Sequence, residues 1–116
     1  MNLKKSMAYI RFLNLSEALV SPGATTDLDA IEKQLLNQIT LAYVKNSLLL
    51  VGDLIGYREY GSQATLHSRL KNLKAHGFIK FQPDEADGRK KFVSPTSKAL
   101  KYYEKLSMCL EKAIQG

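Results

Sequence analysis

The sequence has a single cysteine, two histidines and no long apolar run. One thiol, Cys109, cannot form an intrachain disulfide, and this favours a reducing compartment. Residues 1–12 hold two lysines and a short mixed stretch, without a long apolar core or a small-residue cleavage site. We therefore expect neither a signal peptide nor a membrane span, and we expect a cytoplasmic protein.

Residues that carry catalysis or bind metals are equally sparse. His67 and His76 are nine positions apart, so on one helix they lie on different faces and cannot share a metal ion. The sequence contains no GxxxxGK, GxSxG or HExxH pattern. Cys109 falls on an apolar stripe and is expected in the core. We predict no enzyme activity, no metal site and no cofactor.

What the sequence does have is positive charge, and this charge is unevenly distributed. The chain of 116 residues, a single domain by length, carries a net charge of +6. Residues 47–116 hold twelve Lys and Arg against seven Asp and Glu, whereas residues 1–46 hold five against four. A basic half indicates a polyanionic partner, although lysines on exposed faces also simply keep proteins soluble.

Residues 62–94 have the pattern of a helix followed by a hairpin. Ser62 is a good N-cap, and three leucines then recur at helical spacing as Leu66, Leu70 and Leu73. Gly77 suits the left-handed conformation that ends a helix. A strand, a polar turn and a returning strand are expected at 78–81, 83–88 and 89–93. A helix that leads into a basic hairpin is the plan of a winged helix-turn-helix.

The run from Ala64 to Ile79 (ATLxxxLxxLxxxGFI) resembles the recognition helix and first wing strand of MarR-type transcriptional regulators. Asp87-Gly88-Arg89 and then Val93-Ser94-Pro95-Thr96 are similar to that family's wing motif and the start of its last helix. The resemblance covers about residues 47–105. It implies a mainly α fold with a small β-hairpin (α+β) and an Asp87 carboxylate that holds Arg89 by a charge-assisted bond.

The remaining segments are arranged around this unit. We expect an N-terminal helical arm and linker over 1–26, with its helix at 3–19. A winged helix-turn-helix domain follows over 27–95, and a C-terminal helix over 96–116. Asp27 is expected to cap a helix over 28–43, and Thr96 or Ser97 the last helix. Between 48 and 61 we predict an extended piece at Leu48–Leu49, which adds a third strand to the wing sheet. A short helix to Ile55 and a turn over 56–61 follow it.

Both terminal helices are apolar and need a surface to pack on. One face of the last helix carries Ala99, Tyr103, Leu106, Leu110 and Ala113. The resemblance implies that terminal helices pair two subunits; the alternative is that the last helix folds back on residues 28–43 of its own chain. We expect a homodimer whose contacts include Met7, Ile10, Tyr103, Leu106 and Leu110.

A helical wheel with Leu66 facing the core predicts which residues contact DNA. Its opposite side carries small, polar or basic side chains, which suit a helix in the major groove. Arg89, on the hairpin turn, suits the narrow minor groove. Asp84 and Glu85 must point away or cap the turn. The alternative is an ordinary solvated surface. The predicted contacts are Ser62, Gln63, Thr65, His67, Ser68, Lys71, Arg89, Lys90 and Lys91.

These features predict a nucleoid-associated, sequence-specific regulator of transcription that binds double-stranded DNA. The alternative functions are a winged-helix protein–protein adaptor, since fold does not fix function, and a plasmid or phage replication or partition accessory protein. The resemblance also implies a possible small-molecule effector, in a cleft between the dimer-forming and DNA-binding parts. Tyr43, Tyr57, Tyr60 and Tyr103 could line such a cleft, but a small core is expected to contain tyrosines anyway.

Overall fold

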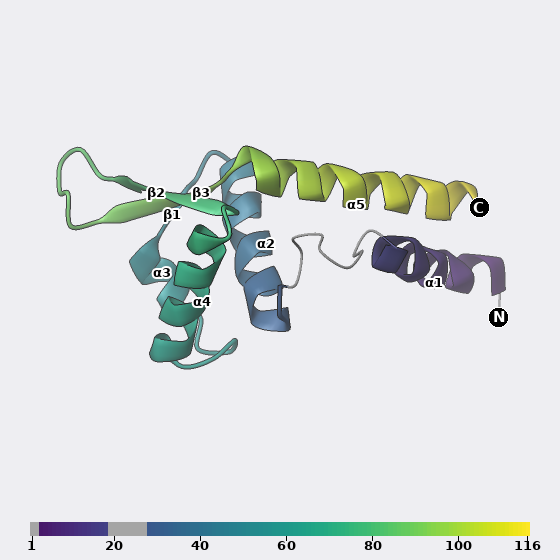
Figure 1. Cartoon of the computed structure of the whole chain (residues 1–116), viewed down its shortest axis with the longest axis horizontal. Coiled ribbons are helices and arrows are strands. Elements are labelled where there is room, and N and C mark those ends of the chain that lie inside the picture. Colours follow the sequence, from purple (N-terminus) through teal and green to yellow (C-terminus); the bar gives the residue numbers. More distant parts are fainter. Residues whose placement is uncertain (1–2, 19–27) are drawn as a thin grey trace. The chain divides into compact units, whose positions relative to one another are not determined.

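A computed structural model describes residues 3–18 and 28–116, with only the backbone described for residues 3–6. The described residues form five helices and one three-stranded antiparallel sheet (Figure 1). This arrangement confirms the predicted α+β winged helix-turn-helix fold. Residues 28–99 make up one compact unit, and α1 with residues 100–116 makes up another. The helices are α1 (Leu3–Ala18), α2 (Ala30–Val44), α3 (Val51–Ile55), α4 (Gln63–Ala75) and α5 (Ser97–Gln115); the strands are β1 (Leu49–Leu50), β2 (Ile79–Pro83) and β3 (Lys91–Pro95).

The core of the 28–99 unit is formed by apolar stripes from three helices and the sheet. The predicted leucine stripe of α4 is confirmed, because Leu66, Leu70 and Leu73 are buried. Burying one such side chain stabilises a fold by roughly 1.5–3 kcal/mol. Four of the fully buried side chains come from α2 and α3, and two from the sheet region: Leu35, Leu36, Ile39, Leu54, Phe78 and Val93.

Helix α2 is capped by Asp29, and the prediction of Asp27 was wrong. Asp27 itself lies outside the described residues. The Asp29 carboxylate accepts a hydrogen bond from the Glu32 N–H at 2.8 Å, and the Glu32 carboxylate accepts one from the Asp29 N–H at 2.9 Å. This reciprocal box requires an acidic or amide side chain three residues after the cap. Asp29 has Glu32 there, whereas Asp27 has Ala30.

The sheet has the order β1-β3-β2, so the predicted third strand is present, one residue later than expected. Both wing strands also end two residues later than predicted. The hydrogen-bonded ladder continues because Pro83 lies opposite Lys91, and the Asp84 N–H then donates to the Lys90 carbonyl at 2.9 Å. The hairpin that results projects beyond α3 and α4 (Figure 1).

The C-terminal end of α4 is tied to the start of α5. Gly77 adopts φ +79°, the left-handed conformation predicted for it. The Thr96 hydroxyl donates to the Gly77 carbonyl, and the Lys98 ammonium donates to the His76 carbonyl at 2.6 Å. Of the two predicted caps, Thr96 is the one whose hydroxyl accepts from the Ala99 N–H, at 3.4 Å.

Helices α1 and α5 are joined by the side chain of Arg11. Its Nε and Nη2 donate to the Ala113 carbonyl at 3.0 and 2.7 Å, and the two helices lie side by side in Figure 1. The predicted apolar face of α5 divides into two stripes. Cys109 and Ala113 are buried, as predicted for Cys109, while Leu110 is 50% exposed. Within residues 3–18 and 28–116, no helix combines the length and apolarity that crossing a membrane requires.

Candidate nucleic-acid interface

One face of α4 is open to solvent along its whole length. The three leucines of α4 are buried in the core on its other face, so the residues predicted on the opposite side point outward. All five of these residues are exposed, and each of them is small, polar or basic: Ala64, His67, Ser68, Lys71 and Ala75. A helix with such a face can approach a polyanion closely, because small side chains leave room and polar ones donate hydrogen bonds.

The first turn of α4 is fixed by its own hydroxyl groups. The Ser62 hydroxyl accepts from the Thr65 N–H at 3.2 Å and donates to the Thr65 hydroxyl at 3.0 Å. Both hydrogen-bonding functions of Ser62 therefore serve the cap. Gln63, next to it, is exposed, and Thr65 is half-buried. Of these three predicted contacts, Ser62 and Gln63 are exposed, and the hydroxyl of Ser62 is already used in the cap.

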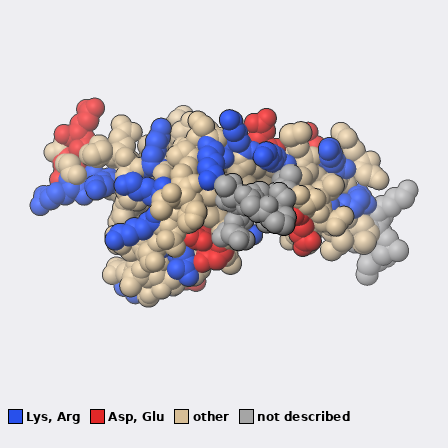
Figure 2. Space-filling view, viewed as in Figure 1, with Lys and Arg blue, Asp and Glu red and all other residues tan. Residues whose placement is uncertain are grey.

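The wing tip is organised by two aspartates. Asp87 accepts from both the backbone N–H and the Nε of Arg89, at 3.1 and 3.2 Å, so the predicted Asp87–Arg89 bond is present. The Arg89 side chain nevertheless stays 92% exposed. Asp84 caps the turn by accepting from the Ala86 N–H at 3.1 Å. Figure 2 shows Lys and Arg along the hairpin and carboxylates near its tip.

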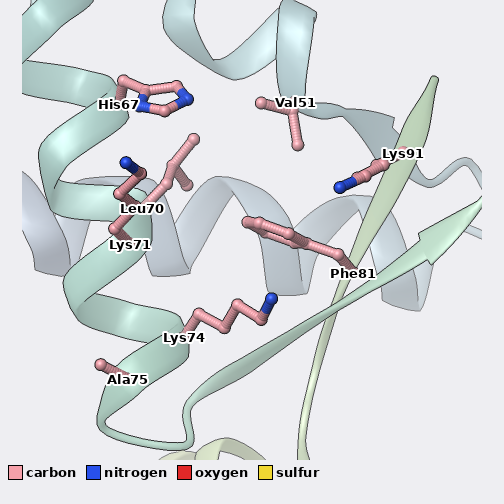
Figure 3. A pocket seen from close by; sticks show the side chains of 8 residues that line it. All are labelled: Val51, His67, Leu70, Lys71, Lys74, Ala75, Phe81 and Lys91. Carbon is pink, nitrogen blue, oxygen red and sulfur yellow. The ribbon is translucent and has the colours of Figure 1, made fainter. Parts of the chain in front are cut away.

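A cleft of about 520 Å³ lies between α4 and the wing (Figure 3). It brings together three of the predicted contacts, His67, Lys71 and Lys91, and adds Lys74. The sequence alone leaves Lys74 as either a phosphate contact or a solvated side chain, and positions 67, 71 and 74 follow one edge of a helix. Arg89 and Lys90 do not line the cleft. Its remaining lining is apolar: Val51, Leu70, Ala75 and Phe81.

An ion pair links α4 to the cap of α2. Arg69 Nε donates to Asp29 Oδ2 at 2.6 Å. Burial by itself would raise the pKa of the Asp29 carboxyl, but the Glu32 N–H and the Arg69 guanidinium outweigh it and lower that pKa below its usual value of 3.8. The N-cap residue of α2 is therefore also bonded to the helix that carries the open face.

The tyrosines considered for an effector site have other partners or are exposed. Tyr57 and Tyr60 contact each other with ring centroids 5.6 Å apart, and Gln38 donates to the Tyr60 hydroxyl at 3.4 Å. Tyr43 is 43% exposed. No three His, Cys, Asp or Glu side chains gather into a metal-binding group within the described part of the chain.

No protein-family model and no curated protein matches the sequence. Solved structures do match. Transcriptional regulator Tm0710 from Thermotoga maritima is 20% identical, with a TM-score of 0.69 over 94% of this chain and 68% of that one. A MepR mutant from S. aureus, bound to an oligodeoxyribonucleotide, is 18% identical, with a TM-score of 0.69 over 97% of this chain and 77% of that one.

PcaV from Streptomyces coelicolor, in complex with its natural ligand, is 20% identical, with a TM-score of 0.56 over 97% of this chain and 73% of that one. All three are MarR-family transcriptional regulators. The chain has the MarR-type winged-helix fold. At these identities the similarity establishes the fold alone.

Proposed function

We propose that the protein is a transcriptional regulator that binds double-stranded DNA in a sequence-specific way. The observation that carries the proposal is the pairing, in one compact unit, of an open polar face on α4 with an exposed arginine at the wing tip. The exposed face of α4 would enter the major groove, where base edges can be distinguished. Arg89 would enter the adjacent minor groove, where the negative potential is strongest.

The similarity to MepR supports this proposal, because that protein was solved with an oligodeoxyribonucleotide. The Asp87–Arg89 bond supports it further. An ion pair this exposed adds little stability, so its main effect is to limit the directions that the arginine can take. The residues proposed to contact base edges and phosphates are those predicted from the sequence on α4 and the wing. Ser62 belongs to them indirectly, through the helix cap that it forms.

The proposed regulator acts as a homodimer through its terminal helices. Leu110 and Ile114 of α5 are 50% and 69% exposed, and Ile10 of α1 is 51% exposed. Uncovered apolar side chains at such positions favour association in water. Two recognition helices would then read half-sites about one helical turn, ~34 Å, apart, and the operator would have two-fold symmetry. A small-molecule effector stays a prediction from the resemblance.

Duplex binding measured by fluorescence anisotropy at low and moderate salt tests the proposal. The proteins compared are wild type, Arg89→Ala and, as a charge control at an exposed position of α2, Lys33→Ala. We expect binding that falls steeply with salt, weakened in Arg89→Ala and unchanged in Lys33→Ala. A folded wild type that binds no duplex at low salt would overturn the proposal in favour of the protein–protein adaptor.

A further inference from the structure

The first residue of α4, Gln63, carries an amide group that faces solvent. Its side chain is exposed and has no hydrogen-bond partner among the residues that the structure describes. A carboxamide places a carbonyl acceptor beside an NH2 donor. In the major groove, adenine presents the complementary pair, an N7 acceptor beside an N6 donor, whereas guanine presents two acceptors. The amide of Gln63 therefore matches the edge of an adenine.

The backbone on both sides of Gln63 is held in place. The Ser62 hydroxyl accepts from the Thr65 N–H at 3.2 Å and donates to the Thr65 hydroxyl at 3.0 Å. The turn that leads into α4 is bonded to α2, because Gln38 donates to the Tyr60 hydroxyl at 3.4 Å. A side chain distinguishes one base from another only if its backbone is held in position. Gln63 meets this requirement.

Small side chains lie beside Gln63 on the open face. With the three core leucines facing inward, the line of α4 that points farthest outward carries Ala64, Ser68 and Ala75, and all three are exposed. Small side chains let a helix come close to base edges. The methyl group of an alanine can also contact the 5-methyl group of thymine, which the other bases of DNA lack. Ala64, next to Gln63, is therefore suited to a thymine.

The same turn of α4 has no group that suits guanine. A guanidinium fork pairs with the O6 and N7 acceptors of guanine. The one arginine of α4 is Arg69, whose Nε donates to Asp29 Oδ2 at 2.6 Å. Residues 63–66, the first turn, contain neither lysine nor arginine. Base pairs that meet this turn are therefore contacted by one amide and by methyl groups.

We propose that the first turn of α4 recognises two adjacent A·T pairs at a fixed position in each half-site of the operator. The Gln63 amide donates to N7 of an adenine and accepts from its N6 amino group, and the Ala64 methyl group contacts the 5-methyl group of a thymine in the neighbouring pair. The inference rests on the proposed function and adds the bases that this site selects.

Selection of duplexes from a random-sequence library tests the assignment of Gln63. Wild type, Gln63→Ala and Asn72→Ala are compared. Asn72 is the matched control, because it is the other exposed amide of α4 and lies nine positions further along, about 14 Å along the helix axis. We expect wild type to select an adenine at one position of each half-site. Gln63→Ala should lose the preference at that position alone, and Asn72→Ala should keep it.

Base analogues in the selected operator locate the two contacts. 7-Deazaadenine, which lacks the N7 acceptor, replaces each adenine in turn. At the contacted adenine it should weaken wild-type binding about five- to 150-fold, the range for one bidentate base contact, and it should not weaken Gln63→Ala further. Uracil in place of the contacted thymine removes one methyl group and should weaken wild type about fourfold. Ala64→Gly should be insensitive to that replacement.

Three results would overturn this inference while the regulator proposal stands. They are a selected operator without a fixed adenine, a Gln63→Ala protein that selects the wild-type sequence, and an adenine preference that Asn72→Ala also loses. A folded wild type that binds no duplex overturns both proposals. Far-UV circular dichroism confirms that each variant is folded.

Discussion

At the scale of single residues, Asp29 has two structural roles that can be separated. Its carboxylate caps α2 through the Glu32 N–H and holds α4 through Arg69. Asparagine caps a helix almost as well as aspartate but carries no charge. Asp29→Asn therefore removes the ion pair and keeps the cap, while Asp29→Ala removes both and should cost about 1 kcal/mol more.

The lowered pKa of Asp29 predicts how this contribution depends on pH. A carboxyl whose pKa is lower in the folded state adds stability above its ordinary value of 3.8, and this stability is lost as the pH falls through the folded pKa. In urea unfolding, wild type should exceed Asp29→Asn in stability near pH 6, and the difference should shrink below about pH 4. Other carboxyls titrate in both proteins, so the difference isolates this one. A difference that stayed constant across that range would contradict the assignment.

At the scale of elements, the end of α4 depends on one backbone conformation. Gly77 has φ +79°, and a methyl group added there would meet only the Lys98 side chain, at 3.8 Å. The cost of Gly77→Ala is therefore backbone strain rather than a clash, roughly 1–2 kcal/mol. Gly52, inside α3 with open space around its Cα, is the matched control, and Gly52→Ala should stabilise by about 0.5–1 kcal/mol. Thermal or urea unfolding of the two variants checks both signs; equal effects would refute the explanation.

The same element shows why some of the structure could be predicted from the sequence. The α4 stripe, its Ser62 cap and its Gly77 end are all encoded within the segment 62–77, at spacings that a helix fixes. The cap of α2 was missed because two aspartates precede that helix, and only the Glu32 spacing separates them. The first wing strand ends two residues too early in the prediction because that prediction assigns Pro83 to the turn, although a proline can still stand at a strand end. The second wing strand has the predicted length but lies two residues later.

Neither the cleft nor the choice of which apolar side chains of α5 are buried could be predicted in the same way. The cleft combines side chains from α3, α4, β2 and β3, which are brought together only by the tertiary fold. On α5, a helical wheel gives one broad apolar arc. Which half of the arc is covered within the chain is decided by α1, through Arg11 and the Ala113 carbonyl. Sequence periodicity contains no information about that choice.

At the scale of the whole molecule, the exposed half of the apolar arc on α5 concerns the oligomeric state of the protein. Leu110 and Ile114 are four positions apart, so they share a stripe on α5, next to the buried Cys109 and Ala113. A stripe that remains 50% and 69% exposed in the protomer is where we expect the second subunit to bind. The exposed part of α1, including Met7 and Ile10, would extend the same interface.

This interface predicts linked changes in assembly and in DNA binding. Sedimentation equilibrium should show wild type as a dimer and Ile114→Lys as a monomer, because a buried lysine would lose its hydration. Glu111→Lys is the matched control, since it introduces the same side chain at an exposed position of the same helix. The monomeric variant should also lose most of its affinity for a two-fold symmetric operator and keep its weaker affinity for a single half-site, because only a dimer binds both half-sites at once. If Ile114→Lys stayed dimeric, the subunits would have to associate elsewhere, and the proposed contacts Tyr103, Leu106 and Leu110 would lose their support.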